Sequence, residues 1–413
     1  MLDIRYIRDN TEEVQESIAR RGLVLDVEEL LAVDTNRRRL IAELEAVQAS
    51  RNVVAAQGKN AKPSTEQISQ GKELKSQHES LELELNKTLD HYNDLISEVP
   101  NTIADGTPDG NEENNQEIHK WGNTDLGFEA KDHLEINEIY NLYDFEAGAK
   151  VSGSKFYFTR HKAVKLWQAI QLATQEIVEA AGFELISVPH LVTTEIAAGS
   201  GFLPKGEENQ NYLDKEQGLV LIATSEIPIT GLHAGEVLDL GSAIKYAGIS
   251  PCYRLEAGAY GKFSKGLYRT HQFDKLEMYV FCKADQSAAT LQAILKIERQ
   301  ICEQFEIPYR VVRIAAGDLS TPAHEKYDVE YYSPADGLYR ELTSCSNCTD
   351  FQARNLNIRY RDDDGNLAFA HTLNGTAVVS SRMPIAILEN HQTADGKVML
   401  PKPIAKYYGS AEL

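Results

Sequence analysis

The sequence predicts an α+β protein in which an antiparallel α-helical coiled-coil hairpin precedes a domain built on a mainly antiparallel β-sheet flanked by helices. Three observations predict it. Apolar residues recur in steps of three and four between residues 28 and 98. A stretch rich in Pro, Gly, Asn and acids follows. Strand-like segments then succeed one another with few helices between them, which favours an antiparallel over a doubly wound parallel sheet.

Two helical seams separated by a break predict the hairpin. The break runs from Gly58 to Ser64, where Gly and Pro end one helix and Ser64 can cap the next. An arm of about 30 residues is about 45 Å long, so the hairpin is an extended element and not a globular core. The first seam consists of Leu30, Val33, Arg37, Leu40, Leu44, Val47, Arg51 and Val54, and the second of Leu74, His78, Leu81, Leu85, Thr88, Tyr92 and Leu95.

Positive charge on the hairpin gathers on its first helix and at the break. The residues are Arg37, Arg38, Arg39, Arg51, Lys59 and Lys62. Such a stripe fits contact with nucleic-acid phosphates, and it fits equally well a solvated helix face. From the residues alone, a spacer or dimerisation element explains the hairpin at least as well as an RNA-binding arm.

The expected domains are residues 1–105, carrying the arm at about 28–98, a linker at 106–125, and a larger domain at 126–413. In the larger domain, residues 162–181 form an amphipathic pattern typical of a helix, followed by a short strand that ends at Pro189. Further strands are expected at 246–253, 277–282, 309–314, 328–332 and 338–343.

Composition limits the classes of function. The 413 residues are 42% hydrophobic and 25% charged, as in soluble globular proteins. The net charge of −20 repels nucleic acid from most of the surface, so any binding of RNA must rest on local basic patches. The N-terminal residues show no signal peptide, transit peptide or membrane span, and the five cysteines fit reduced thiols in a cytosol-like compartment.

The first segment with candidate catalytic and ligand-binding residues runs from Cys252 to Met278. The sequence has no P-loop and no Gly-x-Gly-x-x-Gly after a strand, so ATP phosphates would have to be held by arginines and a metal. A strand is expected to end in Arg254 and Glu256 on one face, and a returning strand brings Arg269, Phe273 and Glu277 to the same place. Arginine binds phosphate and carboxylate with a planar fork, and an aromatic ring can stack on a base.

Two later segments add to this site. Glu341, within Tyr339–Cys348, is an acid of the kind that holds Mg²⁺ between phosphates. The small-residue run from Leu373 to Ser381 is expected to open a helix from which Arg382 reaches a terminal phosphate.

Plainer interpretations compete at several positions. Taken without the other segments, Arg254 and Glu256 could be an ordinary cross-strand ion pair. Cys345 and Cys348 have the spacing of a zinc knuckle, but no second pair of ligands accompanies them, which favours buried thiols over a structural zinc. His271 is interpreted as structural. Lys262 and Lys265 fit residues that only solubilise a loop, but a role over the nucleotide or the RNA acceptor end is favoured.

Taken in order, these strings resemble the catalytic signatures of class II aminoacyl-tRNA synthetases, and specifically those of the seryl-tRNA synthetase family. The coiled-coil hairpin is also similar to the N-terminal arm of that family, so the resemblance covers nearly the whole chain. The strings are Tyr253–Gly258, Arg269–Glu277 and Thr343–Arg354, supported by Gly201–Lys205 and Thr224–Thr230.

The resemblance implies that serine and ATP form seryl-adenylate and that the seryl group then passes to the 3′ end of tRNA(Ser). It implies catalytic roles for Arg254, Glu341 and Arg382, with Mg²⁺ held by Glu341 and Ser344 together with ATP. The implied ATP-binding residues are Arg254, Leu255, Glu256, Phe273, Glu341, Leu342, Thr343, Ser344 and Arg382. The implied serine-binding residues are Thr224, Ser225, Glu226, Arg254, Glu277 and Thr376.

The resemblance also implies a cytoplasmic homodimer whose arm binds a tRNA with a long variable arm, which admits a selenocysteine tRNA as a second substrate. The implied tRNA contacts are Arg37, Arg38, Arg51, Lys59, Lys262 and Lys265. Two other functions compete with this one. The first is a class II ligase that loads an amino acid onto a carrier protein, and the second is a catalytically inactive RNA-binding paralogue.

Overall fold

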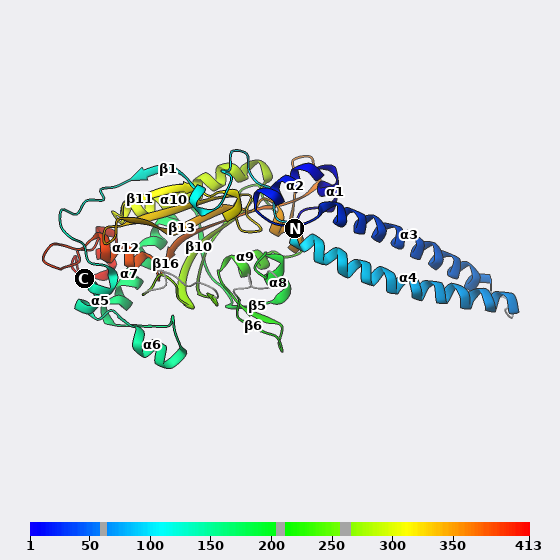
Figure 1. The fold of residues 1–413 in the computed structure, drawn as a ribbon, viewed down its shortest axis with the longest axis horizontal. Coiled ribbons are helices and arrows are strands. Elements are labelled where there is room, and N and C mark those ends of the chain that lie inside the picture. Colours follow the sequence, from blue (N-terminus) through cyan, green and yellow to red (C-terminus); the bar gives the residue numbers. More distant parts are fainter. Residues whose placement is uncertain (58–63, 204–210, 257–265) are drawn as a thin grey trace. The chain divides into compact units, whose positions relative to one another are not determined.

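The computed structural model describes residues 1–57, 64–203, 211–256 and 266–413. The chain divides into two compact units, Met1–Thr102 and Ile103–Leu413 (Figure 1). Among the described residues, no helix is both long and apolar enough to cross a membrane.

The first unit is helical, and its hairpin confirms the expected fold. Short helices α1 (Ile4–Asp9) and α2 (Thr11–Arg20) precede the long helices α3 (Val27–Gln57) and α4 (Thr65–Glu98). Ser64 caps α4 as the sequence predicts. Its hydroxyl accepts a hydrogen bond from the Gln67 amide at 3.1 Å, and the Gln67 side chain accepts one from the Ser64 amide at 2.9 Å. All the predicted seam residues are buried or half-buried, so the 3.5-residue pattern marks the contact between the helices.

A buried carboxylate organises the base of this hairpin. The Asp34 side chain has no exposed surface and pairs with Arg8 at 2.8 Å, Arg37 at 2.7 Å and Arg38 at 3.1 Å. Although burial opposes ionisation, Arg37 and Arg8 hold the pKa of the Asp34 carboxyl below its usual value. The Arg37 guanidinium also lies 4.6 Å from the centre of the Tyr92 ring. Arg37 therefore joins α3 to α4, and Arg8 ties α1 to them.

The second unit is built on an eight-stranded sheet. Every neighbouring pair is antiparallel except β4 and β9, which confirms the predicted α+β class. The five strands expected between residues 246 and 343 are all present. In spatial order the strands are β1 (Gln116–Trp121), β11 (Tyr309–Arg313), β12 (Glu325–Ser333), β13 (Leu338–Asn347), β16 (His371–Val379), β10 (Gln272–Cys282), β9 (Ile244–Tyr253) and β4 (Glu184–Ser187).

Two segments differ from the expectation. Within the expected linker 106–125, residues 116–121 form β1, which pairs with β11 at one edge of the sheet. The small-residue run that was expected to open a helix is instead the central strand β16, and the helix begins only at Met383. The run is small because α10 crosses it closely. A Cβ added at Gly375 would lie 2.2 Å from Cγ2 of Ile294, so no larger side chain fits there.

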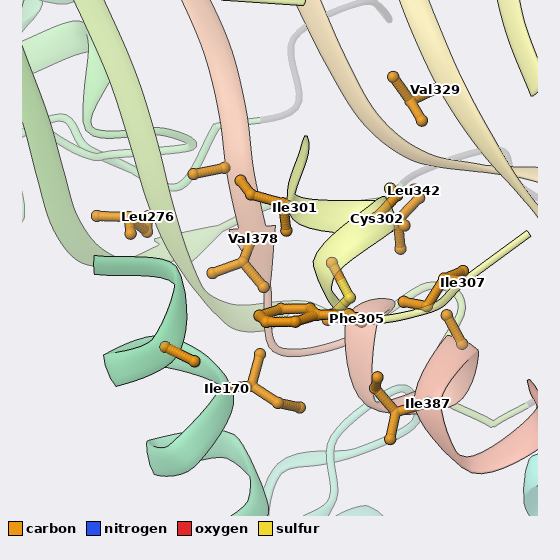
Figure 2. Packing of buried hydrophobic residues seen from close by; sticks show 14 of the residues in the cluster. Ile170, Leu276, Ile301, Cys302, Phe305, Ile307, Val329, Leu342, Val378 and Ile387 are labelled. Atoms are coloured by element: carbon orange, nitrogen blue, oxygen red, sulfur yellow. The ribbon is translucent and has the colours of Figure 1, made fainter. Parts of the chain in front are cut away.

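Three helices cover one face of the sheet and enclose the main core. They are α7 (His161–Ala180), α10 (Ser287–Gln304) and α12 (Met383–Asn390). Figure 2 shows the Phe305 ring, at the end of α10, packed among Ile170 of α7, Val378 of β16 and Ile387 of α12. Because strand residues alternate between faces, the neighbours of these core residues point to the opposite face, where the cavity lies.

The other elements of this unit surround the sheet. The helices are α5 (His133–Tyr140), α6 (Phe145–Ser152), α8 (Thr194–Gly199), α9 (Glu226–Leu232), α11 (Phe351–Leu356) and α13 (Lys402–Tyr408). The short strands are β2 (Tyr143–Asp144), β3 (Phe158–Thr159), β5 (Leu191–Thr193), β6 (Leu213–Asp214), β7 (Leu219–Leu221), β8 (Val237–Leu238), β14 (Arg359–Arg361) and β15 (Leu367–Phe369). A second core cluster packs α8, α9 and α11 over Tyr279 and Phe281 of β10.

Candidate active site

A cavity of about 360 Å³ lies on the sheet face opposite α10, and strands β10, β12, β13 and β16 contribute its floor. Most of the residues that the sequence singles out for ATP and serine lie around it. They are Thr224, Glu226, Arg254, Glu256, Phe273, Glu277, Glu341, Leu342, Ser344, Thr376 and Arg382. The structure thus brings together residues that are up to 158 positions apart, counted from Thr224 to Arg382.

Arg254 and Phe273 form one end of the cavity. The Arg254 guanidinium carbon lies 5.2 Å from the centre of the Phe273 ring, so a cation and an aromatic face are presented together. The backbone of Arg254 is held by His271, whose Nδ1 donates to the Arg254 carbonyl and whose own carbonyl accepts from the Arg254 amide, both at 3.0 Å. His271 therefore fixes the position of Arg254 through the main chain.

Glu256 reaches the cavity by a different route from the one expected. Strand β9 ends at Tyr253, and Glu256 has a φ of 46°, so the shared strand face predicted for Arg254 and Glu256 is wrong. A turn in the left-handed region brings the side chain round instead. Its Oε2 pairs with Arg269 at 3.2 Å, and its carbonyl accepts from Lys155 at 2.9 Å.

The opposite wall carries the groups suited to phosphates. Oε1 of Glu341 lies 2.8 Å from Nη1 of Arg382, the residue immediately before α12. The Glu341 side chain is 41% exposed, so it is only partly removed from water. This partial desolvation opposes ionisation, but the positive charges of Arg382, Lys326 and Arg254 hold the pKa of Glu341 below its usual value. Ser344 lines the same wall, so an ionised carboxylate and a hydroxyl are present, which are the hard oxygen donors that Mg²⁺ prefers.

These two oxygens do not make a complete metal cage. In the part of the chain that the structure describes, no group of three or more His, Cys, Asp or Glu side chains is placed to hold a metal. A divalent ion at Glu341 and Ser344 would therefore need further oxygen ligands from a bound phosphate. Mg²⁺ is usually held in this way, by one or two carboxylates together with the phosphates of a substrate.

The deep end of the cavity is a buried polar cluster centred on Glu226 and Glu277. Oε1 of Glu226 accepts hydrogen bonds from Gln352 at 2.7 Å and from Asn374 at 3.1 Å. Thr376 donates to Glu277 at 3.2 Å. The hydroxyl of Thr224, another predicted residue, accepts from the Glu226 amide at 3.3 Å. This end can thus recognise a small molecule bearing an ammonium and a hydroxyl.

Three predicted residues do not turn their side chains to the cavity. The Ser225 hydroxyl donates to the Gly248 carbonyl at 3.3 Å, behind the site. The Thr343 hydroxyl donates to Glu298 of α10 at 3.1 Å, on the opposite face of the sheet. Leu255 is half-buried and lies outside the lining. Ligand contacts by these three would have to use the main chain.

Sequence reasoning missed other polar residues of the lining. Lys275 lies between Phe273 and Glu277 on β10, and Asn374 precedes Thr376 by two residues on β16, so strand alternation from a chosen residue would have found both. Lys326 of β12 pairs with Asp328 at 3.2 Å and lies opposite Ser346 in the ladder. No motif in the sequence points to Lys326.

The two cysteines with knuckle spacing lie on different faces of the sheet. Cys345 belongs to the main core beneath α10, whereas Cys348 lines the cavity. Burial raises the pKa of both thiols well above the usual value. Neither forms a disulfide, and both are buried.

The residues predicted to contact tRNA are divided. Arg37 and Arg38 share the Asp34 carboxylate described above, and Arg51 donates to Gln48 at 3.3 Å. Lys59, Lys262 and Lys265 lie outside the described residues. Because the Asp34 carboxylate offsets part of the charge of Arg37 and Arg38, the predicted stripe is less positive than its basic residues alone would make it.

Glu226→Gln should stabilise the chain more at high pH than at low pH. Burial, and then the neighbouring Glu277, raise the pKa of Glu226 from 4.5 to about 7. The folded state prefers the protonated Glu226 carboxyl. The stabilisation that this carboxyl contributes is therefore complete below the pKa of Glu226 in the unfolded chain, and it is lost as the pH rises through the pKa in the folded chain. Relative to the variant, the wild type should lose about 2 kcal/mol of unfolding free energy between about pH 5.5 and about pH 8.

Urea denaturation at the two pH values measures this difference. Exposed Glu195→Gln on the adjacent α8 is the control and should show no such pH dependence. A Glu226→Gln effect that is the same at both pH values would contradict the prediction.

Comparison with known proteins agrees with this geometry. Residues 209–391 match the tRNA synthetase class II core domain (G, H, P, S and T), and residues 1–103 match the seryl-tRNA synthetase N-terminal domain. The chain is similar to "Serine--tRNA ligase" of Borrelia garinii subsp. bavariensis, with 42% identity over 99% of this chain and 98% of the relative. It is also similar to that of Dictyoglomus turgidum, with 41% identity over 100% and 99%.

A solved structure extends the likeness to three dimensions. The seryl-tRNA synthetase from Pyrococcus horikoshii complexed with ATP superposes with a TM-score of 0.89 at 35% identity, covering 100% of this chain and 99% of that one. The antiparallel sheet and its cavity are thus the core of a class II aminoacyl-tRNA synthetase. With the full-length relatives and the N-terminal match together, the chain belongs to the seryl-tRNA synthetase family.

Proposed function

We propose that the cavity activates L-serine with ATP to seryl-adenylate and that the chain transfers the seryl group to the 3′ end of tRNA(Ser), as a serine–tRNA ligase. The observation that carries this function is one cavity lined by Arg254 and Phe273, which contact each other, together with two buried carboxylates, Glu226 and Glu277. The full-length relatives named serine–tRNA ligase and the related structure that contains ATP support it.

ATP binding is assigned to the Arg254 end and to the β13 wall. Phe273 stacks on the adenine, Glu256 accepts from its amino group, and the backbone around Leu255, Leu342 and Thr343 completes the contacts. Arg254 holds the α-phosphate and the attacking serine carboxylate. Its positive charge therefore stabilises the negative charge that develops on the α-phosphate oxygens in the transition state. Arg382 binds the γ-phosphate. Mg²⁺ bound with ATP would be held by Glu341 and Ser344 and would neutralise phosphate charge.

Serine is assigned to the deep end. Its ammonium pairs with Glu277, and its hydroxyl is bound by Thr376 and the groups around Glu226, with the backbone at Thr224 and Ser225 closing the pocket. Buried polar groups left unpaired by alanine would disfavour that amino acid, and the small space would exclude larger ones. Activation then depends on position and charge, with no covalent protein intermediate.

The acceptor is assigned as tRNA rather than a carrier protein, because residues 1–103 match a tRNA-synthetase N-terminal domain. Arg37, Arg38, Arg51 and Lys59 on the arm and Lys262 and Lys265 in the larger unit are the proposed tRNA contacts. We assign a cytoplasmic location because the relatives are enzymes of translation.

A homodimer is proposed through α7 and β4. The proposal is supported by β4 lying at an edge of the sheet and by exposed Val164 and Leu172 on α7. Light scattering should give twice the 46.1 kDa mass of the chain, and a monomer at micromolar concentration would overturn the proposal.

Amino-acid-dependent ATP–pyrophosphate exchange, with each standard amino acid tested separately, examines the function. Exchange with serine alone is the expected result. Exchange with another amino acid would overturn the substrate, and no exchange from folded protein would favour the inactive paralogue. Charging of tRNA(Ser) transcripts then tests the second step.

A further inference from the structure

Lys275 is a buried cation in the wall of the active-site cavity, and none of the roles above involves it. Its side chain is 7% exposed, and its Nζ lies 2.7 Å from Oε2 of Glu277, whose side chain is 3% exposed. It stands on β10 between Phe273 and Glu277, and strand alternation places all three on the cavity face. Burying an ammonium is costly unless it is paired, so Glu277 accounts for its stability there.

The contacts to the Glu277 carboxylate fall on one of its two oxygens. Lys275 pairs with Oε2, and the Thr376 hydroxyl donates to the same Oε2 at 3.2 Å. In the part of the chain that the structure describes, both of these polar contacts lie on Oε2. Two groups from neighbouring strands therefore fix the plane of the carboxylate and leave Oε1 to accept a donor from the cavity.

The charges around Glu277 show why a cation is needed. Glu226 of α9 faces the same end of the cavity, and Glu298 of α10 lies beneath the sheet, so Glu277 has carboxyl groups on two sides. Arg254 lies at the other end, beside Phe273. Lys275 is the ammonium in direct contact with Glu277, and its positive charge offsets the negative charge of that carboxylate.

We propose that Lys275 is a positioning residue for amino-acid recognition, which holds Glu277 by Oε2 so that Oε1 receives the ammonium of serine. The inference rests on the proposed function, since it assigns one step of serine binding. Lys275 acts through Glu277 and does not touch the substrate. Its loss should therefore affect ligands that carry an ammonium and spare those that lack one.

A pair of ligands tests this directly. The first is a non-hydrolysable seryl-adenylate analogue with a sulfamoyl link, and the second is the same molecule with the ammonium replaced by hydrogen. Calorimetry on the full-length chain measures both dissociation constants. Lys275→Met should weaken the first ligand roughly tenfold or more and the second less than about threefold, because an oriented bond to a charged group is lost only in the first.

Two further variants sharpen the comparison. Lys275→Arg keeps the charge and should recover part of the loss for the amino ligand. Lys283→Met is the matched control, because Lys283 follows the same strand and pairs with Asp363 at 2.6 Å outside the cavity. It should leave both dissociation constants unchanged. Where Lys275→Met does not fold, the Lys275→Arg comparison carries the test, with a smaller loss confined to the amino ligand.

Equal weakening of both ligands would overturn the proposal, because Lys275 would then contact the phosphate or only support the fold. No weakening of either would overturn it as well. Failure of the proposed function looks different, since the wild type itself would then bind the seryl analogue no better than an alanyl one.

Discussion

Arg254→Ala should lower serine-dependent ATP–pyrophosphate exchange by about 10²- to 10³-fold while the chain stays folded. Arg254 is the cation proposed to hold the α-phosphate, where negative charge develops in the transition state. Loss of its guanidinium therefore removes electrostatic stabilisation of the transition state. The main chain at this position is held by His271 through two hydrogen bonds of 3.0 Å, which alanine preserves. The loss is thus confined to the guanidinium.

Two further variants serve as comparisons for Arg254→Ala. Arg254→Lys keeps a positive charge but not the planar fork, and we expect it to recover only a small part of the rate. Exposed Arg361→Ala on β14 removes an arginine that does not line the cavity and should leave exchange unchanged. Exchange by Arg254→Ala within about threefold of the wild type would remove Arg254 from the proposed catalytic role.

Glu341→Gln should lower exchange by roughly 10²-fold and raise the Mg²⁺ concentration needed for half-maximal rate. The amide keeps the shape of the side chain but lacks the charge that pairs with Arg382 at 2.8 Å and that a divalent ion would bind. Since nearby positive charges hold the pKa of Glu341 below its usual value, the wild-type carboxylate is ionised at neutral pH. Titration of the exchange rate with Mg²⁺ measures both effects.

Glu330→Gln is the matched control for this prediction. Glu330 lies opposite Glu341 in the β12–β13 ladder and pairs with Arg310, away from the cavity. It should change neither the rate nor the Mg²⁺ requirement. A Glu341→Gln variant that is slower but has an unchanged Mg²⁺ requirement would limit Glu341 to orienting Arg382.

The elements with strong periodicity were predictable from the sequence. The two arms and the Ser64 cap follow from seams of 3.5 residues and from one capping box. Strands β9 to β13 were found because their apolar residues alternate or run together between turns. Most of the cavity was found through short strings whose order resembles one family, and the structure shows that these strings meet on one face of a sheet.

The rest depends on tertiary contacts that leave little trace in the sequence. β16 was misinterpreted because Gly375 is small only to admit Ile294 of α10, and a run of small residues looks locally like a helix start. β1 gains its strand conformation from pairing with β11, nearly two hundred residues later in the chain. Arg37 and Arg38 look like free charges until the fold buries Asp34 between them.

The alternation that builds the cavity also limits how the chain can change in length. Lys275 and Glu277 on β10, Thr376 on β16 and Ser344 on β13 face the cavity only because each occupies the correct parity in its strand. Deleting one residue ahead of Thr376 within β16 would present a main-core neighbour to the ligand and bury the threonine beneath α10. Substitutions can therefore accumulate in these strands, whereas insertions and deletions among relatives should be confined to the connecting loops.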